Sequence, residues 1–184
     1  MNKLFLTFII SSFLSSAFTK VDLDCLENFH KKYLNQQLSL ETSDSSKVFI
    51  KKSENYISYI DADAPVFQAI GELQKDGSLD LIFLLKDKEN IHSKNLRGQE
   101  MFANIIEYFG PEKIKKINGF WIKGDNLNAF NTSLKNGLTF EEAAKQTWTG
   151  KQAAKYGYTE AIIKYTEKNR DGQYIKVKVQ FEKP

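Results

Sequence analysis

The residue types best suited to catalysis or metal binding are scarce in this chain. It contains two histidines, His30 and His92, and one cysteine, Cys25. Neither histidine has a second ligand at a metal-like spacing, and no nucleophile motif lies next to either of them. We therefore expect no metal site, and a single cysteine excludes an internal disulfide. Glu107 and Tyr108, near the solvent side of a predicted helix, are the remaining pair that could act as base and acid.

Large aromatic and polar side chains offer a second kind of candidate. Trp121 lies within a strand-like run and Trp148 lies between two helical segments, so each could line a ligand pocket, although such aromatics more often belong to the core. Asn126 and Thr149 stand where helices are expected to begin. Each is therefore either a helix cap or a ligand-binding residue.

The N-terminus has the composition of a signal peptide. The run from Leu4 to Phe18 contains no charge. It is about 15 residues long, whereas a membrane-spanning helix needs about 20, so no stable membrane anchor is expected. Ser15 and Ala17 are small residues at the positions that a signal peptidase reads. The sequence predicts that residues 1–17 are removed and that residues 18–184 are exported, as a periplasmic or secreted domain.

Charge is unevenly distributed along the chain. The net charge is +3, but residues 18–95 carry 10 basic and 13 acidic groups, and residues 96–184 carry 15 basic and 10 acidic groups. A basic second half favours an anionic partner such as nucleic acid or a phosphorylated cofactor. The alternative, that these lysines only solvate helices and strands, stays open.

The first half of the chain has the pattern of a helix followed by an antiparallel meander. Residues 21–38 have the apolar spacing of an amphipathic helix. Four strand-like runs follow, at residues 48–51, 56–60, 66–74 and 79–86. Asp76-Gly77 is a strong signal for a hairpin between the last two runs.

The second half alternates helices and strands. Apolar residues from Met101 to Phe109 share one helical face, and Gly110-Pro111 ends that helix. A strand is expected at residues 114–123. Three helical segments should follow it, the last two opened by capping-box patterns at Thr139 and Thr149.

The chain should end in a β-hairpin formed by residues 158–167 and 174–182. In the second of these strands, apolar residues alternate with polar ones: Ile175, Val177, Val179 and Phe181. We expect this apolar face to pack against the helix at 98–109.

Together these elements predict the fold class. It is α+β, with an antiparallel or mixed sheet of about six to seven strands, a central packed helix, an N-terminal helix and a C-terminal β-hairpin. Hydrophobic residues make up 41% of the chain and charged residues 27%, as in ordinary globular proteins. No internal repeat or long linker divides residues 18–184, which we expect to be a single domain.

Several short motifs are spread over residues 66–184: Phe67-Gln68-Ala69-Ile70-Gly71 with Asp76-Gly77 after it, Arg97-Gly98-Gln99-Glu100-Met101-Phe102, Asn118-Gly119-Phe120-Trp121, Asn126-Leu127-Asn128-Ala129-Phe130-Asn131, Glu141-Glu142-Ala143-Ala144 and Thr147-Trp148-Thr149-Gly150. Together they resemble an uncharacterised domain at the C-termini of large secreted bacterial proteins of the polymorphic-toxin and haemagglutinin-like type. The resemblance implies export, delivery to another cell and a cognate immunity or secretion partner. It identifies no catalytic residue.

The order of elements also resembles the GNAT acyltransferase fold. In that family a glycine-rich turn before the central helix presents backbone N–H groups to the pyrophosphate of acyl-CoA. The matching turn here holds Arg97 and Gly98, which this resemblance makes candidate ligand-binding residues. Glu100 and Phe102 stand where the family has small residues, and a carboxylate there opposes phosphate binding, which implies a degenerate site.

Three function classes follow from the sequence. The first is an exported toxin or effector domain without a cofactor. The second is a GNAT-like transferase, for which alone acyl-CoA would be the cofactor. The third is a non-enzymatic periplasmic binding module. The candidate ligand-binding residues carried forward are Arg97, Gly98, Trp121, Asn126, Trp148 and Thr149.

Overall fold

The strand-like runs and helical segments assemble into one sheet with helices packed on it. The computed structural model describes residues 39–41, 47–86, 89 and 91–184. The predicted signal peptide and the predicted helix at 21–38 lie outside the described residues. The strands are β1 (Ser39–Glu41), β2 (Val48–Ser53), β3 (Tyr56–Asp61), β4 (Gln68–Leu73), β5 (Ser78–Leu84), β6 (Lys116–Trp121), β7 (Glu160–Lys168) and β8 (Tyr174–Glu182). The helices are α3 (Gly98–Phe109), α4 (Asp125–Lys135), α5 (Phe140–Gln146) and α6 (Trp148–Ala154).

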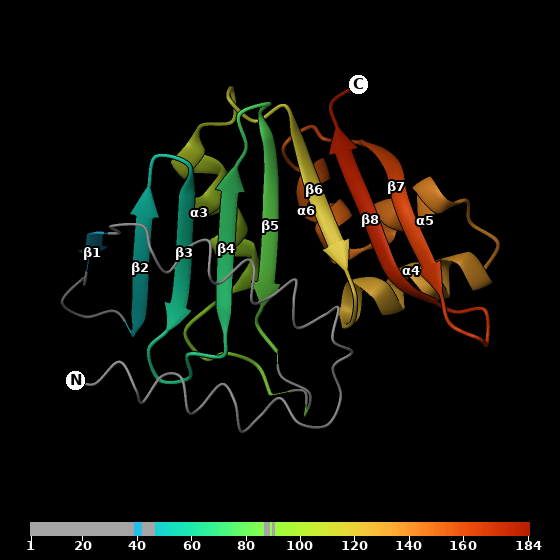
Figure 1. Ribbon diagram of the computed structural model, residues 1–184, viewed down its shortest axis with the longest axis horizontal. Coiled ribbons are helices and arrows are strands. Elements are labelled where there is room, and N and C mark those ends of the chain that lie inside the picture. Colours follow the sequence, from blue (N-terminus) through green and yellow to red (C-terminus); the bar gives the residue numbers. More distant parts are fainter. Residues whose placement is uncertain (1–38, 42–46, 87–88, 90) are drawn as a thin grey trace. The chain divides into compact units, whose positions relative to one another are not determined.

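The sheet is mixed, with strand order β1-β2-β3-β4-β5-β6-β8-β7 (Figure 1). Neighbouring strands are antiparallel except β5 and β6, which run parallel and are connected through α3. The expected α+β class, with its meander, central helix and closing hairpin, is confirmed. The described sheet has one strand more than expected because it includes β1, a three-residue edge strand too short to produce a sequence pattern.

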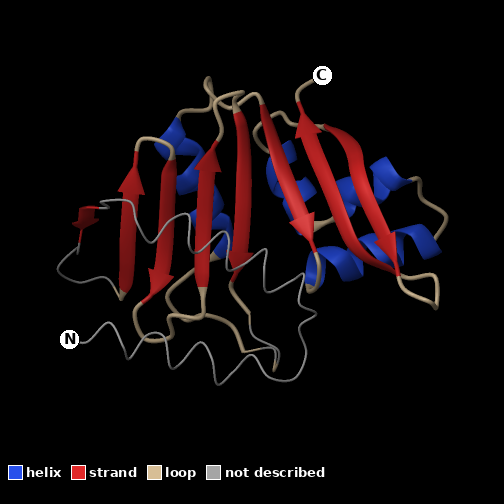
Figure 2. Cartoon of the chain, viewed as in Figure 1, coloured by secondary structure: helices blue, strands red, loops and turns tan. Residues whose placement is uncertain are grey.

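The described helices lie on one face of the sheet, behind it in the view of Figure 2. The strand side chains that face them are buried, for example Ala69, Leu79, Ile117 and Val177. Since successive strand residues point to opposite sides, the residues between these point away from α3–α6. We call this opposite side the second face.

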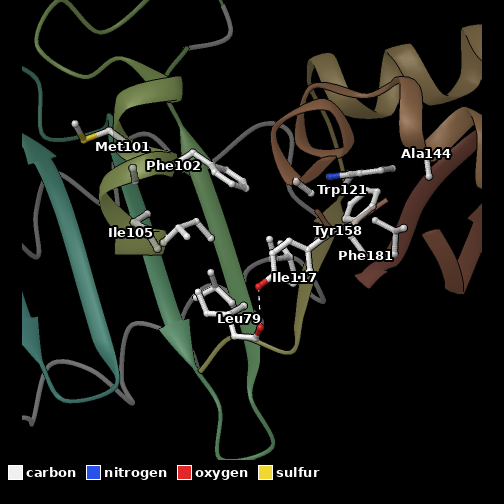
Figure 3. Close-up of a cluster of buried hydrophobic side chains, with 14 of the residues drawn as sticks. Leu79, Met101, Phe102, Ile105, Ile117, Trp121, Ala144, Tyr158 and Phe181 are labelled. Carbon is white, nitrogen blue, oxygen red and sulfur yellow. Dashed lines mark hydrogen bonds between the residues drawn. The ribbon is translucent and has the colours of Figure 1, made fainter. Parts of the chain in front are cut away.

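A hydrophobic core fills the space between the sheet and the helices (Figure 3). Leu79 and Ile117 are neighbours in the parallel β5–β6 pair, and both are fully buried. Ile105 of α3 lies directly over Gly71 of β4, where a Cβ atom would collide with it. The absence of a side chain at residue 71 therefore lets the central helix approach the sheet closely.

The closing hairpin has the expected burial pattern but a different covering helix. Val177, Val179 and Phe181 are buried as predicted, whereas Ile175 is half-buried. The helix that packs on β8 is α4, while α3 packs on β3 and β4. The prediction that residues 98–109 cover the hairpin was wrong, because β5 and β6 lie between β8 and the two strands that α3 covers, β3 and β4.

Candidate functional site

The carboxyl ends of β5 and β6 are the place where this topology would hold a ligand. In sheets with parallel strands, ligands bind beyond the strand ends where the chain connections separate. The two strands pair only over Ser78–Asp80 and Lys116–Asn118, and they then move apart (Figure 1). Because α3 follows β5 and α4 follows β6, both helices begin near this opening.

Side chains of the chain itself fill this region. The Trp148 indole packs against Phe83 of β5, with ring centroids 5.1 Å apart, and against Phe102 of α3, at 6.0 Å. A Cβ atom placed on Gly98 would lie 3.0 Å from Cζ2 of Trp148 and 2.9 Å from Cδ1 of Leu85. The glycine at the start of α3 therefore makes room for Trp148. Its role in this structure is packing.

Asn126 and Thr149 form a reciprocal hydrogen-bonded pair beside Trp148. The Asn126 side-chain amide donates to the Thr149 hydroxyl at 2.8 Å, and the Thr149 backbone N–H donates to Oδ1 of the Asn126 side chain at 3.1 Å. Neither residue caps its own helix, so that prediction was wrong for both. The N-cap of α4 is Gly124, whose φ of 84° suits glycine. The pair instead ties the start of α4 to α6.

Thr147, two residues before the predicted cap, is the N-cap of α6. Its hydroxyl accepts from the Gly150 backbone N–H at 3.1 Å and donates to the Ala144 carbonyl at 2.7 Å. Gly150 lies so close to the backbone of α5 that a Cβ atom would collide with Ala144 and Lys145. The capping box predicted at Thr139 is confirmed.

We predict that Thr147→Ala lowers the free energy of unfolding by about 1–2 kcal/mol, the usual cost of losing a threonine N-cap. Thr147 is fully buried, so the Ala144 carbonyl would also lose its side-chain donor. Urea denaturation measures the change. Thr132→Ala, at an exposed position of α4, is the matched control and should change stability by less than about 0.5 kcal/mol.

Arg97 lies apart from this packed junction. It is the N-cap of α3, but its side chain makes no capping bond. The guanidinium is exposed and lies 3.5 Å from the Glu100 carboxylate. The two side chains line a surface depression with Gln99 and Ala103. A carboxylate thus occupies the place where an anionic ligand would have to bind.

Trp121 and the Glu107–Tyr108 pair do not join the other candidates. Trp121 is buried in the core, where its ring packs near Phe130 and Phe181. The Tyr108 hydroxyl donates to the Ser53 carbonyl oxygen at 2.9 Å, which fastens the end of α3 to β2. The structure therefore brings together four candidates, Gly98, Asn126, Trp148 and Thr149. Arg97 and Trp121 lie elsewhere.

A buried carboxylate that no sequence pattern predicts, Asp61, holds the loop before α3. Asp61 accepts hydrogen bonds from the Ser93 hydroxyl at 2.6 Å and the Asn95 amide at 2.8 Å. It also accepts from the backbone N–H groups of Asp63 and Ala64. Burial acts to raise the pKa of the Asp61 carboxyl, but these hydrogen bonds outweigh it and hold the pKa below its usual value. No local motif marks Asp61, because Ser93 and Asn95 lie far from it in the sequence.

A row of exposed side chains on the second face was also missed. Phe120 of β6 pairs with Lys178 of β8, and Lys178 pairs with Tyr165 of β7. All three are exposed. The alternation of apolar residues and lysines in β8 indicates that Lys178 is exposed. Its cross-strand partners, Phe120 and Tyr165, depend on the order of strands in the sheet, which the sequence does not indicate.

Neither a membrane-spanning helix nor a metal centre is found in the part of the chain that the structure describes. None of its helices is long and apolar enough to cross a bilayer. Its acidic, histidine and cysteine side chains form no group of three that could bind an ion. Comparison with models of protein families, with curated proteins and with solved structures finds no match for this chain.

Proposed function

We propose that this chain is an exported, effector-type domain that acts by binding a partner rather than by acyl transfer. The observation that carries this proposal is the position of Trp148. Its indole ring fills the region where β5 and β6 separate, in contact with Phe83 and Phe102. A ligand at this topological switch point would first have to displace a packed aromatic ring.

Displacing Trp148 would be costly. The aromatic group around it extends from Phe83 through Phe102 to Tyr156, whose ring lies 5.8 Å from that of Phe102. Full burial of a large aromatic side chain contributes on the order of 2–3 kcal/mol, and the half-buried Trp148 contributes a part of this, which a ligand would have to replace. The Glu100 carboxylate, in the first turn of α3, further disfavours a phosphorylated ligand.

The motifs behind the effector resemblance also have packing roles in this structure. Thr147 caps α6, Trp148 fills the space between β5 and α3, Thr149 bonds to Asn126, and Gly150 permits the close contact with α5. This supports a packing role rather than a reaction centre as the basis of the resemblance. Export is supported by the charge-free run before residue 18.

Titration of the purified full chain with acetyl-CoA in a calorimeter tests the proposal. We expect no binding, because the switch point is filled and Glu100 opposes the phosphates. Glu100→Gly removes that carboxylate, and any residual binding should be stronger in this variant. Tight binding of acetyl-CoA by the unmodified protein would contradict the proposal and would make the transferase function the better one.

A further inference from the structure

A row of three exposed side chains crosses the second face over strands β6, β8 and β7. Phe120, Lys178 and Tyr165 are cross-strand partners, so they share one side of the sheet. Their strand neighbours Trp121 and Val177 are buried on the other side, against the helices. The two aromatic side chains lie two strand spacings apart, about 10 Å, with the lysine between them.

The second face leaves this row accessible. Phe120 is 48% exposed and Tyr165 is 49% exposed. Lys178 is exposed as well, and it forms no ion pair with any residue that the structure describes. Ile162, next to Tyr165 on β7 and 38% exposed, extends the apolar surface. The row therefore offers two apolar rings with an uncompensated positive charge between them.

A β-bulge in β7 creates this arrangement. The pairing with β8 shifts between Ile163 and Tyr165, so that Tyr165 rather than Lys164 is opposite Lys178. Without the shift, regular pairing would place two lysines side by side and would turn Tyr165 toward the helices. Bulges re-aim side chains in this way, often next to functional sites.

Nearby carboxylates do not cancel the charge of Lys178. Glu167 accepts a hydrogen bond from the Tyr165 hydroxyl at 3.0 Å and lies 3.0 Å from the Lys176 ammonium. Glu182 lies four residues further along β8, where it accepts a hydrogen bond from the Gln180 side chain. Lys116 and Lys176 pair with Asp76 and Glu167, whereas Lys178 has no such partner among the residues that the structure describes. An anionic partner therefore suits this surface.

We propose that this surface binds single-stranded nucleic acid, with Phe120 and Tyr165 stacking on bases and Lys178 binding a backbone phosphate between them. Unpaired bases present flat apolar faces that stack on aromatic side chains, and each nucleotide brings one negative charge. An apolar protein partner would bury the Lys178 ammonium without a counter-charge, which is costly. A duplex keeps its bases stacked on each other and cannot use the two rings.

This inference rests on the proposed binding function and names its ligand. Fluorescence anisotropy of the full chain with labelled oligothymidylate and oligouridylate tests it, and the tighter of the two shows whether the ligand is DNA or RNA. Phe120→Leu and Tyr165→Leu keep an apolar side chain but remove the ring. We expect each to weaken binding by about 5-fold to 150-fold, the effect of losing one base stack.

Lys178→Gln should weaken binding and reduce the slope of log Kd against log salt by roughly 1, as expected for one lost phosphate contact. The matched controls are Phe49→Leu, on the same face at β2, and Lys151→Gln, on α6. Both positions are exposed, and neither change should alter binding. Circular dichroism confirms that each variant is folded before it is compared.

Three results would overturn the inference. They are no binding of either oligonucleotide at low salt, unchanged binding by both leucine variants, or equally tight binding of inorganic polyphosphate, which has no bases. None of these results decides the outcome of the acetyl-CoA titration. A chain that binds neither ligand refutes only the nucleic-acid assignment, whereas a chain that binds acetyl-CoA refutes the proposed binding function itself.

Discussion

Val177→Asp is expected to unfold the domain or to leave it barely stable. Val177 is fully buried in β8, on the side that faces the helices, and its Cα pairs with that of Trp121. An ionised carboxylate there would have no cationic partner, since its strand neighbour Trp121 also belongs to the apolar core. The expected loss is on the order of 4 kcal/mol or more, comparable with the total stability of many domains.

Lys178→Asp is the matched control for this variant, because it also introduces an aspartate, but at the next residue of β8, which is exposed. It should cost less than about 1 kcal/mol. Lys176 is a poorer control than the sequence suggests, since its side chain is only 20% exposed and pairs with Glu167. Urea denaturation compares the two variants. Equal destabilisation by both would mean that the register of β8 is wrong.

Local signals predicted most of the elements of this fold. Asp76-Gly77 marks a hairpin because glycine permits the positive φ of 83° found at residue 77. Gly110 ends α3 with a φ of 84°, and Thr139 opens α5 with a complete capping box. Each of these features depends on residues within a few positions of each other. Such features can be read from one sequence.

The candidate site depended on contacts between distant segments, which the sequence does not reveal. Asn126 has a residue type suited to capping, but it lies two residues after the N-cap Gly124 and bonds to Thr149 instead. Thr147 and Thr149 fit an N-cap equally well by type, and only the close approach of α5 at Gly150 distinguishes them. Tyr165 is opposite Lys178 because of a β-bulge that no residue pattern predicts.

Asp61→Ala is the second variant with a large expected effect. Asp61 is 1% exposed, and its carboxylate accepts four hydrogen bonds, two from the Ser93 and Asn95 side chains and two from backbone N–H groups. The variant leaves these donors without their acceptor. Buried unsatisfied donors cost about 1–3 kcal/mol each where water cannot reach them, so we expect a loss of about 3 kcal/mol or more.

The effect should extend to the start of α3. The Ser93 hydroxyl also accepts from the Leu96 backbone N–H at 2.8 Å, so Asp61 holds the segment that leads into Arg97 and Gly98. Hydrogen exchange should therefore increase at Leu96 and in the first turn of α3 in Asp61→Ala. Asp171→Asn, at an exposed carboxylate in the turn between β7 and β8, is the control and should change neither stability nor exchange at α3 measurably.

Asp61 also predicts how stability depends on pH. Its pKa is lowered in the folded protein, so folding favours the charged form. Its contribution is therefore fully present above the unfolded pKa of about 3.9, and it is lost as the pH falls through the folded value. Asp61→Asn removes this titration while keeping the size of the side chain. We expect the difference in stability between the unmodified protein and Asp61→Asn to be constant above about pH 5 and to shrink below about pH 4. A difference that stays constant down to acid unfolding would show that the Asp61 carboxylate does not contribute through its charge.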